Sequence, residues 1–493
     1  MLVEIADAAT ATGGHAHLLL EPVHWAQDAW RIADDLLGQH LRIFIGFVLA
    51  LLVVGRLTIE KRNPSNVYAW GLVIFFIPWL GVPLYFIFGG RKIRKLVRAK
   101  LALNVFTAKL AAGGAAAPAA PQKKFGHNSF QLFGDGVEGF NALRAEIAGA
   151  KKSIHLQTFI LGRDEPARQI IADLVAKARA GVEVKLLLDA LGCLGATGRF
   201  VEPLRQAGGR VARFMPVVPL QTKWSANLRN HRKFAIFDRD RVLVGGQNID
   251  RRFMDARDTP GLFVDFGAVI AGPAVAPFNE SFTGDWCFAT GESPEKFRDL
   301  LAYKPADSAD GTEEVEVVTC GPDADGDMLW ERLLILVQQC RRELTIVTPY
   351  FVPDEVLFRS LIVQGHLGRK VRIILPETSN HILADFARHY YLRQLHDAGV
   401  EVLLYTPKMM HAKLVLVDGE TALMGSANMD IRSLFVNFEI GVFLTSGKAI
   451  SDLTSWTDKL CRDCVTYLDS GHAGAGANRR VMEDFAHLLG PLL

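Results

Sequence analysis

An eighteen-residue pattern occurs twice in this sequence, and the repetition constrains the fold more than any other feature. The first copy is HRKFAIFDRDRVLVGGQN (231–248) and the second is HAKLVLVDGETALMGSAN (411–428). Both fit H-x-K-x4-D-x6-G-[GS]-x-N. A single H-x-K on a strand is commonly incidental, but two full matches with identical internal spacing indicate an internal duplication.

Shorter similar stretches precede each copy in the same order. They pair KKSIHLQTFI (151–160) with RRELTIVTPYF (341–351), ARAGVEVKLLLD (178–189) with GHLGRKVRIILP (365–376), and GGRVARFMP (208–216) with AGVEVLLYTP (398–407). Short apolar runs alternate with amphipathic stretches throughout, which is typical of α/β domains. We therefore expect two homologous α/β domains, residues 125–310 and 311–493, packed about a pseudo-twofold axis.

The two H-x-K segments read as strands that end in hairpin turns. Successive side chains of a strand point to opposite faces, so His231 shares a face with Lys233, and His411 with Lys413. Asp238 and Asp418 fall in turn-like positions that follow the apolar runs. The glycines at the end of each returning strand let backbone approach a ligand and bring Asn248 and Asn428 back toward the histidines.

Two such units facing each other would suit a phosphodiester. Lysines neutralise the non-bridging oxygens, asparagine amides donate to them, one neutral histidine attacks phosphorus and the opposite protonated histidine supplies the leaving alcohol with a proton. The intermediate would be a phosphohistidine. Neither copy contains ligand spacing of the HExxH kind, so we expect no metal and no other cofactor.

Two acidic residues occupy equivalent places after the two copies. Asp265 lies in VDFGAV (264–269) and Glu439 in FEIGVF (438–443). Each could orient a histidine by accepting its second ring proton, or could instead pair with a surface arginine.

The N-terminal region carries the signals of a membrane anchor. Residues 67–88, VYAWGLVIFFIPWLGVPLYFIF, form an uncharged stretch long enough to cross about 30 Å of hydrocarbon as one helix. Residues 41–57 are a weaker second span, and the short connector containing NPSN (63–66) favours a helical hairpin over about 41–90. Residues 1–40 lack the pattern of a cleaved signal peptide.

Basic residues follow the second span. RKIRKLVRAK (91–100) is rich in Lys and Arg, so the positive-inside rule predicts a multi-pass protein of the inner (plasma) membrane with its catalytic domains in the cytoplasm. Ala, Gly and Pro dominate residues 108–124, which read as a linker within the segment 91–124.

Composition excludes some classes of protein. A formal net charge of +2 counts against a protein that coats nucleic acid, so we expect no nucleic-acid partner. Six cysteines in 493 residues do not form a disulfide framework, and the single CxxC (461–464) lacks the second pair of a zinc site.

The repeated H-x-K-x4-D-x6-G-x-x-N pattern resembles the phospholipase D superfamily. The strings NLRNHRK (227–233), DWCFATGE (285–292), TPYFVPDE (348–355) and NMDIRS (428–433) make the chain similar to the bacterial cardiolipin synthases of that superfamily, as does the apolar N-terminal region. The resemblance implies a phosphatidyltransferase that joins two phosphatidylglycerol molecules into cardiolipin and releases glycerol.

The resemblance also implies roles for residues of this chain. It implies His231 as the nucleophile and His411 as the acid. The catalytic set would be His231, Lys233, Asp238, His411, Lys413 and Asp418, with Asn248, Asn428, Glu439 and Asp265 around the substrate. A hydrolytic phospholipase D, a transphosphatidylase using another alcohol and a superfamily nuclease are alternatives. The acceptor alcohol, acyl preference and oligomeric state stay open.

Overall fold

The computed structural model describes residues 64–85, 94–113, 123–217, 227–323, 326–472 and 476–490, with single gaps at 197, 446 and 489, and scattered positions between 38 and 55. The chain divides into two compact units, Met1–Gly89 and Gly90–Leu493. Most of the expected span 41–57 lies outside the described residues.

The first unit contains two short helices where a single long one is expected. Helix α2 (Pro64–Phe76) ends at Ile77, whose backbone is not helical, and α3 (Pro78–Leu84) begins at the following proline. Proline lacks the N–H that a continuing helix needs, and its ring clashes with the preceding turn. The helices contact each other, with the rings of Trp70 and Tyr85 5.5 Å apart. The sequence predicts a helix over 67–88 that is kinked at Pro78 and Pro83; the structure breaks it fully before Pro78 but not at Pro83, which lies within α3. No helix among the described residues has the length and hydropathy of a membrane span.

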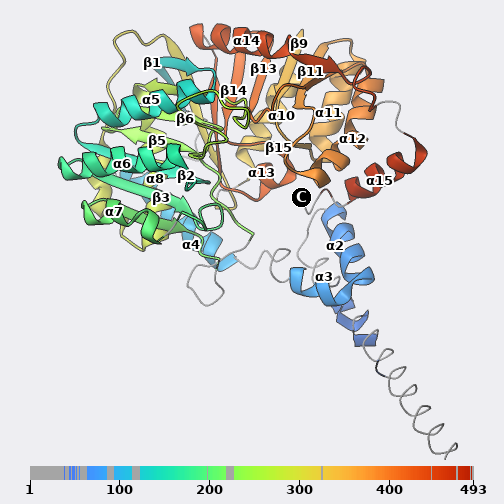
Figure 1. Ribbon diagram of the computed structural model, residues 1–493, viewed down its shortest axis with the longest axis horizontal. Coiled ribbons are helices and arrows are strands. Elements are labelled where there is room, and N and C mark those ends of the chain that lie inside the picture. Colours follow the sequence, from blue (N-terminus) through green and yellow to red (C-terminus); the bar gives the residue numbers. More distant parts are fainter. Residues whose placement is uncertain are drawn as a thin grey trace, which may run out of the picture. The chain divides into compact units, whose positions relative to one another are not determined.

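The second unit is built on a continuous sheet (Figure 1). The first half of the chain contributes β1 (Lys124–Phe133), β2 (Ser153–Thr158), β3 (Glu183–Asp189), β4 (Arg210–Phe214), β5 (Phe234–Phe237), β6 (Arg241–Gly245) and β7 (Gly267–Ala271). The second half contributes β8 (Glu313–Cys320), β9 (Glu343–Val347), β11 (Lys370–Pro376), β12 (Glu401–Tyr405), β13 (Leu414–Val417), β14 (Thr421–Gly425), β16 (Glu439–Leu444) and β17 (Cys464–Thr466).

The order of the strands is the same in both halves. From the centre outward the first half reads β1-β7-β6-β5-β2-β3-β4 and the second reads β8-β16-β14-β13-β9-β11-β12, followed by β17. Strands β1 and β8 pair antiparallel and join the halves, with Phe125 opposite Val315. The inner strands pair antiparallel, whereas β2-β3-β4 and β9-β11-β12 pair parallel. The prediction of a duplicated α/β fold is confirmed.

Helices flank the sheet in corresponding places. In the first half these are α5 (Gly136–Gly149), α6 (Glu165–Arg179), α7 (Glu202–Gln206), α8 (Ala276–Thr290) and α9 (Arg298–Ala302), preceded by α4 (Arg94–Ala111). In the second half they are α10 (Met328–Gln339), α11 (Glu355–His366), α12 (Ile382–Asp397), α13 (Ile431–Phe435), α14 (Lys448–Cys461) and α15 (Ala477–Leu488). Aspartate side chains cap the first turns of several, including Asp135 at α5 and Asp354 at α11.

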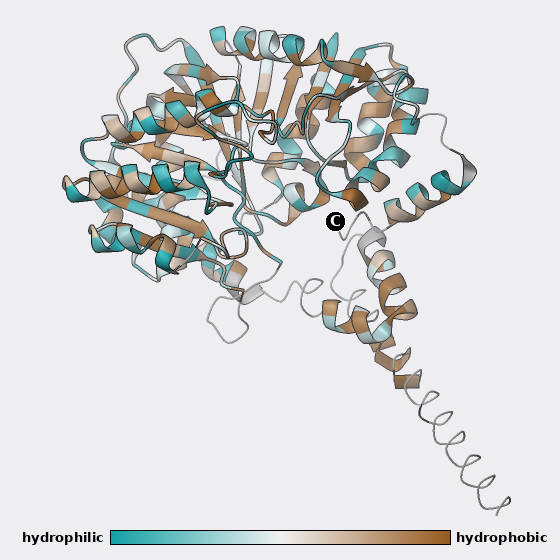
Figure 2. Cartoon of the chain, viewed as in Figure 1, coloured by the Kyte–Doolittle hydropathy of each residue, from teal (hydrophilic) through white to brown (hydrophobic). Residues whose placement is uncertain are grey.

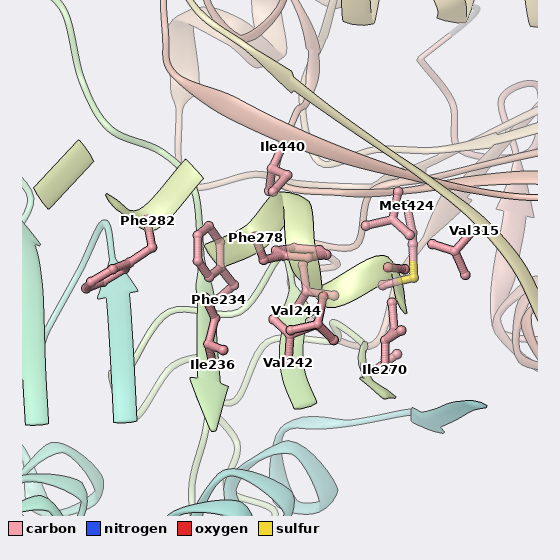
Figure 3. Packing of buried hydrophobic residues seen from close by; sticks show 14 of the residues in the cluster. Phe234, Ile236, Val242, Val244, Ile270, Phe278, Phe282, Val315, Met424 and Ile440 are labelled. Atoms are coloured by element: carbon pink, nitrogen blue, oxygen red, sulfur yellow. The ribbon is translucent and has the colours of Figure 1, made fainter. Parts of the chain in front are cut away.

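Apolar strands form the core (Figure 2). Strands β5 and β13, which follow the two H-x-K segments, are buried along their whole length, as expected where helices cover both faces of a sheet. One hydrophobic cluster spans the junction of the halves and includes Phe234, Phe278, Val315, Met424 and Ile440 (Figure 3). Burial of an aliphatic or aromatic side chain stabilises by about 1.5–3 kcal/mol, so this shared core holds the halves in a fixed relation.

Candidate active site

The two histidines lie where the halves of the chain meet. His231 donates its backbone N–H to the carbonyl of Phe438 at 2.9 Å, and His411 donates to the carbonyl of Val264 at 2.7 Å. Isolated parallel bridges between Asn230 and Phe438 and between Val264 and Met410 continue these contacts. Each histidine is therefore fixed by backbone of the opposite half.

The acidic partners also cross between the halves. His231 Nδ1 lies 2.8 Å from Glu439 Oε1, and His411 Nδ1 lies 2.9 Å from Asp265 Oδ2. Both carboxylates are fully buried. A carboxylate that accepts the Nδ1 proton fixes the tautomer of the ring, so Nε2 of each histidine is the nitrogen that carries a lone pair for chemistry.

A buried lysine accompanies each histidine. Lys233 Nζ donates to the carbonyl of His231 at 2.6 Å, and Lys413 Nζ donates to the carbonyl of His411 and lies 2.8 Å from its Nδ1. Because Nδ1 cannot donate to Asp265 while accepting from an ammonium, we assign its proton to the bond with the carboxylate. Two lysines in a dry site provide the positive charge that a phosphodiester anion requires.

Burial shifts the pKa values of these four groups downward. Burial lowers the pKa of Lys233 to about 7 and that of Lys413 to about 8, although Glu439 and Asp265 oppose the change. Burial also lowers the pKa of His231, against the raising effect of Glu439. Burial and the Lys413 cation hold the pKa of His411 well below its usual value. Both imidazoles are therefore neutral at pH 7 in the free protein.

The two carboxylates are not equivalent. The hydroxyl of Ser426 donates to Glu439, whose pKa lies below its usual value because His231, Lys233 and this hydroxyl outweigh burial. Gly246 occupies the place of Ser426 in the first copy, and a Cβ there would come within 2.7 Å of Asp265 Oδ2. Burial raises the pKa of Asp265 to about 6. Glu439 is therefore more completely ionised at neutral pH than Asp265.

Both asparagines of the pattern are buried. Neither histidine lies on a strand, contrary to the prediction from the sequence, because β5 begins at Phe234 and β13 at Leu414. Asn248 Oδ1 accepts from the backbone N–H of Ile160 at 3.1 Å, and Asn428 Nδ2 donates to the Ser433 hydroxyl at 3.2 Å. Asn428 Oδ1 is buried and has no hydrogen-bond partner among the described residues. The bond to Ile160 uses only the Oδ1 of Asn248, whereas the group of Asn428 that stays unpaired is an acceptor oxygen.

The structure does not bring the aspartates of the pattern to the histidines. Asp238 and Asp418 directly follow β5 and β13, whereas the histidines precede these four-residue strands, which are roughly 13 Å long at about 3.3 Å per residue. The Asp238 carboxylate accepts from the backbone N–H groups of Lys151, Lys152 and Ser153. Asp418 accepts in the same way from residues 341–343. Each aspartate therefore ties a hairpin turn to the start of a neighbouring strand.

A buried ionic network beside the site has no counterpart among the sequence predictions. Asp285 on α8 binds Arg232 Nη1 and Lys100 Nζ, each at 2.8 Å, and Lys100 also lies 2.6 Å from Asp323. Arg232 Nε donates to the carbonyl of Glu439 at 3.0 Å. Arg232 and Lys233 directly follow His231 in the sequence, and Lys100 connects α4 to both halves. Asp285, Arg232 and Lys100 lie in the strings DWCFATGE, NLRNHRK and RKIRKLVRAK, but the sequence assigned none of them to the site.

Aromatic rings pack on both imidazoles, and periodicity gave no sign of them. The Phe159 ring lies 4.9 Å from that of His231, and the Phe253 ring lies 4.8 Å from that of His411. Both are edge-on contacts, which fix the ring planes and exclude water.

Within the part of the chain that the structure describes, no group of three or more His, Cys, Asp or Glu side chains is arranged to bind a metal ion.

Comparison with known proteins decides the family. The model of the family described as "Cardiolipin synthase, PLD-like domain" matches residues 143–286 and 333–461, which contain both H-x-K segments. The chain belongs to this cardiolipin synthase family. A second family model, "Phospholipase_D-nuclease N-terminal", matches residues 45–90.

Individual relatives agree with this membership. The chain is 30% identical to the major cardiolipin synthase ClsA of Bacillus subtilis, over 92% of this chain and 98% of that protein. It is 29% identical to cardiolipin synthase 1 of Bacillus cereus, over 92% of this chain and 94% of that protein. Among solved structures, the phosphatidylserine synthase of Haemophilus influenzae matches with a TM-score of 0.57 at 17% identity, covering 78% of this chain and 98% of that one, which supports the fold.

Proposed function

We propose that this protein is a cardiolipin synthase, which transfers the phosphatidyl group of one phosphatidylglycerol to the headgroup hydroxyl of another and releases glycerol. One observation carries the proposal. Two H-x-K histidines meet at the junction of the halves, each with Nδ1 on a buried carboxylate of the other half and each beside a buried lysine. In a member of the cardiolipin synthase family, this is the equipment for transfer of a phosphodiester group.

The first half-reaction forms the enzyme intermediate. His231 is the nucleophile, as the family resemblance implies, and the ionised Glu439 accepts its Nδ1 proton and leaves the Nε2 lone pair free to attack. Nε2 forms a bond to phosphorus while the bond to the glycerol oxygen breaks, and His411 gives that oxygen a proton. Since His411 is neutral in the free protein, it takes up this proton as the phosphodiester anion binds and raises its pKa.

The second half-reaction reverses the proton movements. His411 accepts the proton of a headgroup hydroxyl of a second phosphatidylglycerol, whose oxygen bonds to phosphorus as the bond to His231 breaks. Lys233, Lys413 and Asn248 bind the non-bridging oxygens throughout, and Asn428, whose Nδ2 donates to Ser433, holds its loop in place. Asp238 and Asp418 act at a distance by fixing the two hairpins.

The N-terminal unit associates the enzyme with its lipid. Among its described residues Phe75, Phe76, Ile77, Trp79 and Leu80 all expose more than half of their surface. Apolar side chains so close together are costly in water and suit the hydrocarbon of a bilayer. Together with the basic segment 91–100, they support a multi-pass anchor in the plasma membrane, with the catalytic unit on the cytoplasmic side.

A phospholipase D that uses water, or a transphosphatidylase that uses another alcohol, would need the same histidines and lysines and is the second candidate. A nuclease is less favoured because the net charge is only +2.

Incubation of the purified full-length protein with vesicles of labelled phosphatidylglycerol alone separates these functions. Equimolar cardiolipin and glycerol would support the synthase. Phosphatidic acid as the sole product would identify a hydrolase, and the absence of any lipid product from a folded protein would refute both.

A further inference from the structure

Equivalent loops of the two halves have opposite chemical character. Strands β3 and β11 occupy the same place in the two halves of the sheet. Strand β3 runs parallel to β2 and β11 runs parallel to β9, so the loops that follow β3 and β11 lie at the edge of the sheet where β2 and β9 also end. The first loop is ALGCLGA (190–196) and the second is ETSNH (377–381). The first has no charged or hydroxyl side chain, whereas the second consists of polar residues.

The first loop contacts Phe159, whose ring packs on His231. Cys193 Sγ donates to the carbonyl of Phe159 at 3.2 Å, and a Cβ on Gly192 would come within 2.0 Å of the same carbonyl oxygen. Leu191 and Leu194 expose 40% and 53% of their surface on this loop. Leu191 and Leu194 thus add exposed apolar surface to the loop that contacts Phe159.

The second loop contacts Tyr350, whose ring lies near that of His411. The Tyr350 hydroxyl donates to Asn380 Oδ1 at 2.5 Å, and the Tyr350 ring lies 5.1 Å from that of His381 and 6.3 Å from that of His411. Asn380 and His381 are exposed, so their remaining donors and acceptors can reach a ligand.

Tyr350 and Ile160 occupy equivalent positions in the two halves, and their side chains differ in polarity. The Thr348 hydroxyl donates to the carbonyl of Tyr350 at 3.0 Å, and the Thr158 hydroxyl donates to the carbonyl of Ile160 at 2.9 Å. Ile160 is thus the counterpart of Tyr350. An aromatic ring packs on each histidine, but Tyr350 also contacts an amide and an imidazole, whereas its counterpart Ile160 has an aliphatic side chain.

We propose that Tyr350, Asn380 and His381 form a polyol subsite, which binds the free hydroxyls of the leaving or incoming glycerol group beside His411. Phe159, Leu191 and Leu194 then face the diacylglycerol part of the phosphatidyl group on His231. A hydroxyl bound in this subsite transfers its proton to His411 Nε2 as its oxygen bonds to phosphorus and the bond from phosphorus to His231 breaks. This proposal rests on the proposed transferase function and adds the basis of its preference for glycerol over simpler alcohols.

The subsite makes the choice between acceptors measurable. Glycerol and 1-propanol offer the same primary hydroxyl, but only glycerol has further hydroxyls for the subsite. Vesicles of phosphatidylglycerol are incubated with the full-length enzyme and equal concentrations of labelled glycerol and 1-propanol, and labelled phosphatidylglycerol is compared with phosphatidylpropanol. The ratio comes from one intermediate, so it does not depend on the amount of active enzyme.

We expect Tyr350→Phe and Asn380→Ala each to lower this ratio three- to tenfold, the size of one lost hydrogen bond. Tyr390→Phe is the matched control, because Tyr390 on α12 stacks on His487 and should leave the ratio unchanged. Leu194→Ala should raise the KM for lipid and leave the ratio unchanged.

An unchanged ratio in both Tyr350→Phe and Asn380→Ala would overturn the subsite even while transfer continues. Phosphatidic acid alone from the unmutated protein would instead refute the transferase function, so the two failures are distinguishable.

Discussion

His231, from the first half of the chain, has its Nδ1 2.8 Å from a carboxylate oxygen of Glu439, from the second half. The reciprocal pair joins His411 to Asp265. Each H-x-K segment therefore lacks its own orienting acid, and neither half is a complete catalytic unit. The single continuous sheet, joined at β1 and β8, is what keeps both pairs assembled.

Replacement of Glu439 by glutamine should remove the anion that orients His231 without removing its volume. We expect kcat to fall by about 10²–10⁴, as when the carboxylate of a catalytic triad is neutralised. Ser426→Ala, which removes only a hydroxyl that donates to Glu439, should cost much less. Turnover of phosphatidylglycerol in mixed micelles measures both variants, and Glu439→Gln activity within tenfold of the unmutated enzyme would contradict the role.

The order in which the histidines act can be tested with phosphatidyl-p-nitrophenol, whose leaving group departs without a proton. His411→Ala should release nitrophenol in a burst equal to the enzyme concentration and then stall, because no base activates the acceptor. His231→Ala should give no burst, since no nucleophile remains. A burst from His231→Ala together with none from His411→Ala would reverse the assignment.

Activity should decline on the alkaline side of neutrality because a lysine loses its proton there. Burial lowers the pKa of Lys233 to about 7 and of Lys413 to about 8, so the free enzyme loses positive charge as pH rises through these values. The lipid phosphate stays anionic, and kcat/KM should therefore fall between about pH 7 and 9. Lys233→Arg, whose guanidinium stays protonated, should move this decline to higher pH even if its activity is low. The profile is measured from pH 5 to 9, and a decline unmoved by the substitution would exclude Lys233 as its source.

Local patterns in the sequence predicted the duplicated body correctly. Buried strands such as β5 and β13 are continuous apolar runs, and the repeated order of strands follows from repeated strings in the sequence. The helix expected over 67–88 is divided rather than only kinked at Pro78, because the proline has no N–H to continue the hydrogen-bond pattern of α2.

The arrangement around the histidines depends on packing between the halves, which residue spacing does not encode. Asp265 and His411 are 146 residues apart, and their proximity follows from the shared sheet. The same holds for Lys100, whose contact with Asp323 spans 223 residues. The pattern also groups Asp238 and Asp418 with the histidines. In the structure each aspartate follows its strand, at the end away from the histidine. Sequence spacing alone does not distinguish a residue of a turn from a residue that reacts.

The buried network around Asp285 should be necessary for stability. Burial alone would raise the pKa of Asp285, but Arg232 and Lys100 lower it to about 2, so it is ionised and doubly paired. Asp285→Asn leaves the buried Arg232 without its carboxylate and Lys100 with Asp323 alone, and should destabilise by about 3–5 kcal/mol. Glu292→Gln is the control, because its ion pair with the half-exposed Arg210 is worth at most about 1 kcal/mol. Thermal melts in detergent compare them, and equal melting temperatures would show that the network is dispensable.

Asp418→Asn should affect stability more than catalysis. The residue has a φ of 56°, which asparagine also tolerates, so the substitution removes mainly the charge that accepts three backbone N–H groups. Hydrogen bonds to a charged group are worth about 1.5–3 kcal/mol, and a loss of this size should lower the melting temperature by a few degrees.

The dependence of that loss on pH identifies its cause. The backbone N–H groups hold the pKa of Asp418 below its usual value despite burial, so its stabilising contribution is complete above the unfolded pKa of about 4 and disappears as pH falls through the lower folded pKa. Asp418→Asn should thus melt below the unmutated protein at pH 7, and the difference should shrink steadily toward pH 3. At pH 7 and a temperature where both are folded, kcat should stay within about threefold. A large drop in kcat with an unchanged melting temperature would instead return Asp418 to the catalytic set.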